Sequence, residues 1–266
     1  MYPLLFEIQG YKAYSYGTVM VLAFILCIAF ALKYAPKNLL SHQDLYNFCL
    51  ITMASLLMGT KLIDMFVHGN FSPAACLNLL KFWQRGSFSF FPALLLAIIL
   101  IFIYCKLKKI SFLKTMDYLF PFALLGMAIQ RSFGCFLAGC CYGKPTQLPW
   151  AIIFPGSSRA GSHFPGTPIH PTQLYYGIAA ATIFLFLLWH KKKSRHEGEI
   201  SALGLMMLAA SYFFITFFRG DIGADQVFHH ISRSQYYALA LLLAGLFILL
   251  LHVSKGKKYQ NEQEEP

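Results

Sequence analysis

Long apolar stretches alternate with short polar and basic stretches along almost the whole chain of 266 residues. A membrane-crossing helix needs about 20 mostly apolar residues, and seven stretches approach that length. The pattern therefore predicts an all-α integral membrane protein with seven transmembrane helices. We place these helices at about residues 16–33, 45–67, 88–105, 118–138, 174–189, 200–218 and 236–252.

Composition supports a membrane protein. Hydrophobic residues make up 57% of the chain and charged residues only 12%, whereas about a quarter of the residues are charged in soluble domains. The net charge of +11 could suggest a nucleic-acid partner. However, the basic residues gather at helix ends, where anionic lipid headgroups attract them. We therefore expect no nucleic-acid partner.

The basic residues also predict the orientation, because basic loops stay on the cytoplasmic side. They gather after the first, third and fifth apolar stretches and again after the seventh. With seven spans, this pattern puts the N-terminus outside and the C-terminus inside. The residues are Lys33, Lys37, Lys106, Lys108, Lys109, Lys114, Lys191, Lys192, Lys193, Arg195, Lys255, Lys257 and Lys258.

We interpret residues 1–254 as one membrane domain, followed by a flexible polar tail at 255–266. Its outer loops are expected at about 69–87, 143–173 and 219–235. The first apolar run lacks a small-residue cleavage pattern, so we expect the first helix to remain in the mature chain. The seven cysteines are an odd number and lie mostly inside predicted spans, which argues against a disulfide framework.

Several ionisable residues fall at similar depth in the outer half of the predicted membrane. Arg131 lies about fourteen residues beyond Asp117, roughly 21 Å into a core of ~30 Å, and Arg219 ends the sixth span. A charge at mid-membrane costs ~2.5–3.5 kcal/mol, so it usually pairs or lines a cavity. Lys61 could simply pair with Asp64, Arg219 could reach the outer headgroups, and Arg131 could have a structural partner.

A basic cavity at this depth would suit a lipid phosphate, because guanidinium offers two parallel donors to phosphate oxygens. Tyr16 opens the first span at the same outer face. Gly134, Gly139 and Gly143 remove side chains nearby. Their spacing fits either close helix packing, as in small-xxx-small motifs, or close approach of a ligand.

The last outer segment before the fifth span is "PIHPTQLYYG". His170 precedes a proline and is therefore biased to an extended conformation. It is either a hydrogen-bonding scaffold residue or a group for acid–base work. Thr172 is a candidate helix cap, and Gln173 and Tyr175 lie in the first turn of the helix.

We predict no metal site. His229 and His230 are adjacent but lack an obvious third ligand. Cys135, Cys140 and Cys141 lack the second cysteine pair that zinc sites use. These three cysteines are either packing residues or, in a second interpretation, include a thiol nucleophile.

The chain resembles the prolipoprotein diacylglyceryl transferase family over nearly its whole length. The resemblance rests on "YSYGTVM", "RSFGCFLAGCCYGKPTQLPWAIIFP", "HPTQLYYG" and "GEISALGLMMLAASYFFITFFRGD". It implies a seven-helix body with an outer N-terminus, and transfer of diacylglyceryl from phosphatidylglycerol to the cysteine thiol of a lipobox-containing precursor. The residues on family motif positions are Tyr16, Gly134, Gly139, Gly143, His170, Gln173, Tyr175 and Arg219.

Several family positions are changed. Phe91 stands where the family has the histidine of its H-G-G motif, and Cys135, Ala138 and Cys140 replace Asn, Asn and Glu. Ser132 occupies the family's arginine position, and the arginine of this chain, Arg131, comes one residue earlier. On a regular helix this shift would rotate the side chain by ~100° about the helix axis unless the turn is distorted. "EFFR" reads "TFFR" and "LYE" reads "LYY". The phosphate-facing features thus survive better than the acid–base ones.

Two hypotheses follow. The first is a phosphatidylglycerol-dependent transferase, or a related lipid-headgroup transferase, at the outer face of a bacterial cytoplasmic membrane, with His170 or a thiol as the base. The alternative is an inactive lipid-binding or lipid-transport protein; an ion transporter would need more acidic groups at depth. We expect a multi-pass monomer without a cofactor. The candidate catalytic residues are His170, Arg131, Arg219 and Tyr16, and the candidate substrate-binding residues are Gly134, Gly139, Gly143, Gln173, Tyr175 and Lys61.

Overall fold

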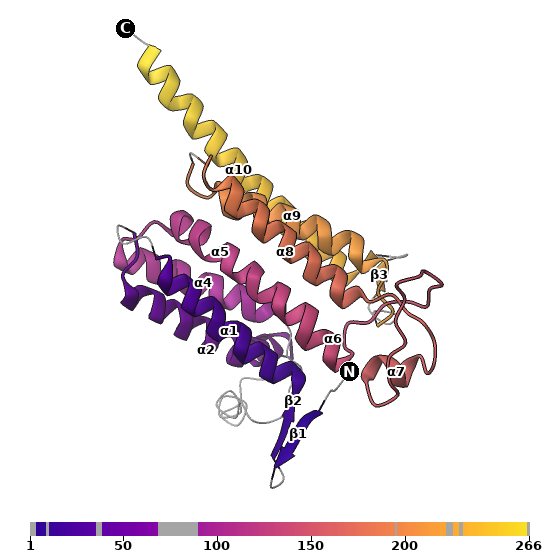
Figure 1. Ribbon diagram of the computed structural model, residues 1–266. Helices are drawn as coiled ribbons and strands as arrows, with labels where there is room; N and C mark the ends of the chain where they lie inside the picture. The colour runs from indigo at the N-terminus through magenta and orange to yellow at the C-terminus, as the bar shows by residue number, and fades with distance from the viewer. Residues whose placement is uncertain are drawn as a thin grey trace. The chain divides into compact units, whose positions relative to one another are not determined.

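The computed structural model describes residues 4–8, 11–35, 39–68, 90–194, 196–221, 226–228 and 231–264. Long helices dominate this part of the chain (Figure 1), and each predicted apolar stretch lies largely within one of them. The helices are α1 (Ser15–Lys33), α2 (His42–His68), α4 (Phe90–Lys108), α5 (Phe112–Ile129) with its extensions η1 (Gln130–Cys135) and α6 (Phe136–Ala138), α8 (Thr172–His190), α9 (Glu199–Thr216) and α10 (Arg233–Glu264).

Short elements that the all-α prediction omits flank the long helices. An antiparallel hairpin precedes α1 and is formed by β1 (Leu4–Ile8) and β2 (Tyr11–Tyr14). A second hairpin precedes α10 and is formed by β3 (Gln226–Phe228) and β4 (Ile231–Ser232). The segment before α8 carries one short helix, α7 (Arg159–His163).

The structure confirms a mostly helical protein whose long apolar helices are consistent with a membrane protein, while the count of seven spans stays a prediction. Among the described residues, four helical segments are long and apolar enough to cross a membrane, and Ser234–Leu250 is a shorter apolar segment. The four are Ser15–Lys33, Phe112–Ala138, Thr172–His190 and Glu199–Thr216.

The chain divides into two compact units, where the sequence predicts a single domain. One unit comprises Ala31–Thr115 and contains α2 and α4, which pack against each other. Ser41 and Asp44 form a reciprocal cap that begins α2: the Ser41 hydroxyl and N–H both donate to Asp44, and the Asp44 N–H donates to the Ser41 hydroxyl. Tyr104 of α4 donates to Asp44 at 2.8 Å and fixes the helix pair.

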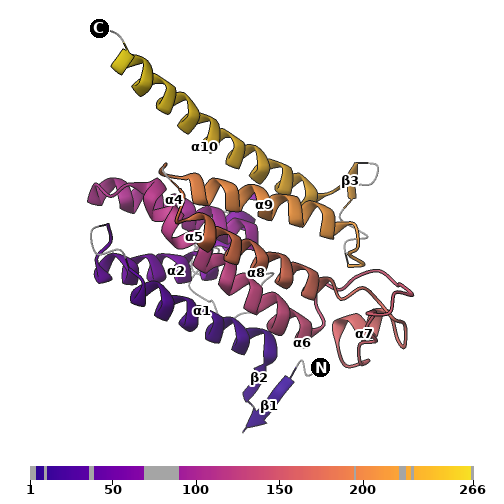
Figure 2. The same cartoon turned by 45° about the horizontal axis from the view of Figure 1, so that its top comes forward.

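The other unit comprises Met1–Phe30 and Met116–Pro266 and contains the candidate site. Within it, α9 packs against both α8 and α10, and the three helices run alongside one another in both views (Figures 1 and 2). Apolar side chains from α5, α8 and the start of α9 form its largest described core cluster. They are Leu124, Ile183, Leu187 and Ile200.

Asp117 of α5 caps the first turn of α9. Its carboxylate accepts hydrogen bonds from the backbone N–H groups of Gly198 and Ser201 and from the Ser201 hydroxyl. A helix leaves its first N–H groups without internal partners, so an acidic side chain there satisfies them and complements the helix dipole. The contact therefore fixes α9 against α5.

Replacing Asp117 with alanine should destabilise the protein by about 1–2 kcal/mol, because the N–H groups at the start of α9 lose their acceptor. Unfolding of the purified protein in detergent would measure the loss. Ser211→Ala is the matched control, since its hydroxyl donates only to a carbonyl within α9; we expect a change within about 0.5 kcal/mol. Equal stabilities of the two variants would contradict the assigned role of Asp117.

Two predicted connections have local structure. The backbone of residues 255–264 continues α10, and its Lys, Glu and Gln residues are good helix formers; that this segment is a flexible tail stays a prediction. The loop predicted at 143–173 has its own small core of Tyr142, Phe154, Ala160 and Ile169. The loop predicted at 69–87 lies outside the described residues.

Candidate active site

The candidate site is built around a change of helix type at the end of α5. From Gln130 to Cys135 the backbone forms the π-helical turn η1, which holds more residues per turn than an α-helix. In a regular α-helix, Arg131 would be rotated by about 100° from the family's arginine position, Ser132. The wider turn accommodates the one extra residue between Arg131 and Gly134. This π-helical turn is therefore the distortion that lets Arg131 occupy the place of the family's arginine.

Arg131 is held by aromatic rings, a tyrosine hydroxyl and a cysteine sulfur. Its Nη1 donates to the Cys141 sulfur at 3.0 Å, and its Nη2 donates to the Tyr212 hydroxyl at 2.8 Å. The guanidinium carbon lies 5.1 Å from the centre of the Tyr176 ring and 5.8 Å from that of Tyr212, within the range of cation–π attraction. Within the described part of the chain, no carboxylate pairs with Arg131. The described partners of Arg131 therefore include a sulfur and two tyrosines but no carboxylate.

Arg219 has the opposite environment. It follows α9 by a few residues, and its Nε and Nη2 donate to the two Asp221 oxygens at 2.9 and 2.8 Å. Burial alone would lower the pKa of Arg219, but Asp221 and Cys141 raise it above its usual range. The side chain is thus paired with a carboxylate in the described part of the chain.

Both arginines influence the Cys141 thiol, Arg131 by direct contact and Arg219 by its charge. Hydrogen bonds from the thiols of Cys135 and Cys140, and then the charges of Arg131 and Arg219, hold the pKa of the Cys141 thiol well below its usual range. Both guanidinium groups therefore act on the same sulfur.

Three thiols gather beside these arginines. The sulfur atoms of Cys135, Cys140 and Cys141 all lie within 4.8 Å of one another, an arrangement that could hold a metal ion. The start of α8 fixes their backbone: Thr172 donates to the Cys141 carbonyl at 2.6 Å, and Gln173 donates to the Cys140 carbonyl at 2.8 Å. Thr172 therefore does not cap its own helix as predicted, because its hydroxyl is used by the neighbouring segment.

The glycines do not form the helix-packing face that their spacing allows. Gly139 ends α6 in a left-handed conformation, with φ of 68°. Gly143 is buried, and a Cβ atom there would overlap the Cβ and carbonyl of His170. A Cβ at Gly134 would overlap the Gln130 side chain. Gly139 and Gly143 are approached closely by the outer segment, at Ser158 and His170, whereas Gly134 is crowded by Gln130 of its own turn.

Backbone bridges hold the outer segment to the end of α9. Gly143 forms an antiparallel bridge with Arg219, and its N–H donates to the His170 carbonyl at 3.1 Å. The Lys144 N–H donates to the backbone carbonyl of Phe218 at 2.8 Å. The segments that carry the predicted His170 and Arg219 are thereby joined through one glycine.

His170 stands in a short polar and aromatic chain. Its Nδ1 lies 3.1 Å from the Tyr175 hydroxyl, to which the indole N–H of Trp150 donates at 2.7 Å. The imidazole also packs against the Phe218 ring at a centroid distance of 5.1 Å. Burial lowers the pKa of His170 below its usual value of 6.5, so the ring is neutral at pH 7.

The remaining predicted residues have different outcomes. Tyr16 lies in the first turn of α1, and its carbonyl accepts a hydrogen bond of 3.3 Å from the Gln130 side chain, which brings it to the π-turn. Lys61 and Phe91 belong to α2 and α4, but their side chains lie outside the described part of the chain. His229 and His230 also lie outside it.

Sequence reasoning missed the tyrosines that surround Arg131. Tyr176 and Thr216 occupy the positions where "LYE" and "EFFR" carry glutamate, and their hydroxyls lie 3.1 Å apart. The rings of Tyr176 and Tyr212 are 4.6 Å apart. The altered motifs could have indicated this arrangement. Because this chain lacks the two family glutamates at these positions, neutral side chains can surround Arg131 there.

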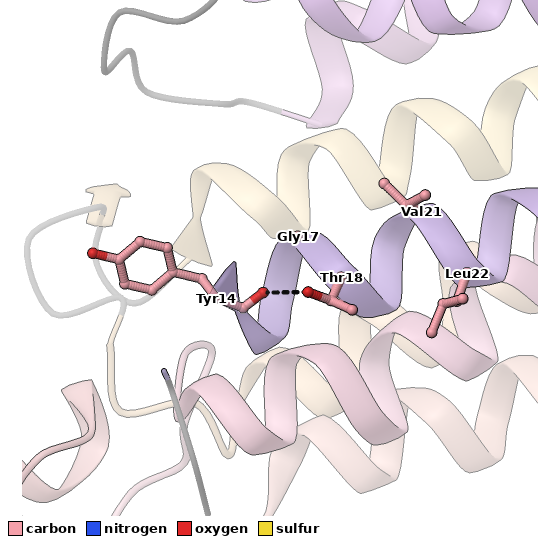
Figure 3. Close-up of a pocket in the computed structure, with 5 residues that line it drawn as sticks. All are labelled: Tyr14, Gly17, Thr18, Val21 and Leu22. Atoms are coloured by element: carbon pink, nitrogen blue, oxygen red, sulfur yellow. Dashed lines mark hydrogen bonds between the residues drawn. The ribbon is translucent and has the colours of Figure 1, made fainter. Parts of the chain in front are cut away.

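An open cavity of about 520 Å³ lies on the first turns of α1, near Tyr16. Figure 3 shows its lining, with the Thr18 hydroxyl directed back to the Tyr14 carbonyl at 3.1 Å. The residues Tyr14, Gly17, Thr18, Val21 and Leu22 line this mainly apolar hollow, which does not include the arginines.

Fold and site define a mostly helical membrane protein with a cationic site at the ends of apolar helices. A family model described as prolipoprotein diacylglyceryl transferase matches residues 3–251. The chain belongs to this family.

Similar proteins align with this chain over almost their whole length. A phosphatidylglycerol–prolipoprotein diacylglyceryl transferase of Clostridium tetani is 31% identical, over 93% of this chain and 96% of its own. A protein of Clostridium perfringens with the same activity in its name is 29% identical, over 97% and 98%. One of Bordetella avium is 28% identical, over 96% of both chains.

Proposed function

We propose that this protein transfers the diacylglyceryl group of phosphatidylglycerol to the cysteine thiol of a lipobox-containing lipoprotein precursor. Family membership and the named activity of the relatives support this over an inactive lipid-binding protein. The observation on this chain that supports it most is Arg131, a cation without a carboxylate partner among the described residues, beside a second arginine near the same sulfur.

In this reaction the acceptor sulfur attacks the glycerol carbon that carries the phosphate. A carbon–sulfur bond forms, the carbon–oxygen bond to phosphate breaks, and glycerol phosphate leaves with the bond's electrons. The enzyme must remove the thiol proton and stabilise the negative charge that grows on the leaving phosphate. Its site residues must meet these two needs.

We assign the main phosphate contact to Arg131, because Asp221 offsets most of the charge of Arg219. Arg219 instead adds potential at longer range, and its backbone bridge fixes Gly143. The hydrogen bond from Gln130, the residue before Arg131, to the Tyr16 carbonyl supports a role for Tyr16 at the same site. Gln173 positions the cysteine segment through the Cys140 carbonyl. Gln173 thus has a positioning role in this proposal, where the sequence suggests contact with the substrate.

We assign the base to His170. This role requires the tautomer in which Nδ1–H donates to the Tyr175 oxygen, because Nε2 then carries the lone pair that accepts the thiol proton. Trp150 and Tyr175 would orient the ring. A neutral imidazole at pH 7 is suited to this task.

The pH dependence of transfer tests this assignment. Because burial lowers the pKa of His170 below 6.5, the base stays unprotonated to lower pH, and the rate should be constant from neutral pH past 6.5 before it falls. Initial rates from about pH 5 to 8 would show this, with His170→Asn as the variant that loses both rate and inflection. An inflection above 6.5 in the unchanged protein would contradict the assignment.

We further propose that all seven long helices cross a bacterial cytoplasmic membrane, with the N-terminus outside, and that the protein acts as a monomer. The basic residues at alternate helix ends support this orientation. A reporter active only in the cytoplasm, fused to the C-terminus, should be active. The same reporter at the N-terminus should be silent, and the reverse result would overturn the orientation.

Complementation tests the function itself. Cells depleted of their own transferase should survive, and lipidate a reporter lipoprotein, when they receive this chain. Rescue should be lost with Arg131→Ala and kept with Arg159→Ala, because Arg159 is exposed on α7. Stable insertion without rescue would contradict the proposal and favour the lipid-binding alternative.

A further inference from the structure

The three thiols of the candidate site are brought together by an unusual backbone path. Cys135 ends the π-turn, and the Cys140 N–H donates back to its carbonyl at 3.2 Å. Gly139 and Cys141 both have positive φ, at 68° and 54°, a conformation that is uncommon for a residue with a side chain. The chain therefore turns back on itself, and the sulfurs of Cys140 and Cys141 come within 4.8 Å of the Cys135 sulfur.

The backbone of this cluster is fixed from outside. The carbonyls of Cys140 and Cys141 accept hydrogen bonds from Gln173 and Thr172, two fully buried side chains of α8. All three cysteines are free thiols. The sulfurs are therefore positioned before any ligand arrives, which favours binding because little ordering is left to occur.

The donor set selects a class of metal ion. Thiolates favour soft metals such as Cu(I) and Zn(II). Structural zinc sites are almost always four-coordinate, and among the described residues the group contains three sulfurs and no fourth ligand. Cu(I) has a filled d shell and accepts three thiolates in a plane, so it fits this set without an additional ligand.

The surrounding charge suits the same ion. A Cu(I) ion with three thiolates carries a net charge of −2, and Arg131 donates to the Cys141 sulfur at 3.0 Å and approaches the Cys135 sulfur at 3.9 Å. Donors directed at ligating atoms are typical of the surroundings of metal sites. Thiols that merely filled space would not need a guanidinium directed at sulfur.

We propose that Cys135, Cys140 and Cys141 form a three-thiolate binding site for Cu(I), with Arg131 as its hydrogen-bonding partner. The inference does not depend on the proposed lipid transfer. The full chain, purified in detergent and kept reduced without oxygen, would be titrated with Cu(I) against a competing chelator. We expect one Cu(I) per chain and a sulfur-to-copper charge-transfer absorption in the ultraviolet.

Variants locate the site. Cys135→Ser or Cys141→Ser should abolish the absorption and the tight binding. Cys105→Ser, which removes a buried thiol of α4, should leave both unchanged. Arg131→Ala should weaken Cu(I) binding about 10–100-fold, the usual effect of removing a partner of a ligating atom. Tight binding that survives loss of Cys135 or Cys141 would overturn the proposal.

A second measurement needs no variant and so does not depend on their folding. Cu(I) should slow alkylation of Cys135, Cys140 and Cys141, mapped by mass spectrometry, but not of Cys27 or Cys49. Equal alkylation with and without Cu(I) would contradict the site. Zn(II) is the second probe: tight Zn(II) binding without Cu(I) binding would overturn the choice of metal.

Discussion

Replacing Arg131 with alanine is expected to lower the rate of diacylglyceryl transfer about 10²–10³-fold, the usual effect of removing one preorganised donor from a developing negative charge. Its guanidinium is held by Tyr212, Tyr176 and Cys141 and has no carboxylate partner within the described residues. Arg219 is paired with Asp221 and so cannot fully replace its charge. Rates with labelled phosphatidylglycerol and a precursor peptide would measure the loss.

Two further variants separate charge from geometry. Arg131→Lys keeps the charge but loses the planar pair of donors, so its rate should fall between wild type and Arg131→Ala. Arg159→Ala removes an exposed arginine of the outer segment and should leave the rate near wild type. If Arg131→Ala and Arg159→Ala lowered the rate equally, Arg131 would have no special role.

Replacing Gly143 with alanine is expected to damage both stability and transfer. A Cβ atom at Gly143 would overlap the Cβ and carbonyl of His170, and the residue is bridged to Arg219. Because the obstacle includes backbone, it cannot rotate away, and overpacking of this kind costs about 1–3 kcal/mol or more. The shift would displace two candidate catalytic residues, so transfer should fall further than stability alone explains.

Gly156 provides the matched control within the same outer segment. A Cβ atom there would meet nothing within 4 Å, so Gly156→Ala should leave both stability and rate close to wild type. Unfolding in detergent and transfer rates would be measured for both variants side by side. A Gly143→Ala variant as stable and active as Gly156→Ala would mean that the close approach to His170 is not needed.

The helices could be predicted from the sequence, because long apolar runs have few alternatives in a membrane. The two hairpins could not, since Leu4–Ile8 and Gln226–Phe228 are short and their pairing depends on context. The polar residues beyond Lys255 predict exposure to water, but polarity alone does not say whether their backbone is helical.

The candidate site was predicted as a set of residues but not as an arrangement. Motif positions pointed to His170 and Arg219, and both lie in the segments joined at Gly143. The π-turn that carries Arg131 has no sequence signal of its own beyond the extra residue before Gly134. The partners of Arg131 come from α8, α9 and the segment after α6, so only tertiary structure could identify them.

The lipid preference of the purified protein tests most directly whether Arg131 holds an anionic headgroup. Native mass spectrometry would count phosphatidylglycerol and phosphatidylcholine bound from an equal mixture, for wild type, Arg131→Ala and Arg159→Ala. We expect wild type and Arg159→Ala to favour phosphatidylglycerol, and Arg131→Ala to lose that preference. Equal binding of the two lipids by wild type, or an unchanged preference in Arg131→Ala, would contradict the assignment of the anionic headgroup to Arg131.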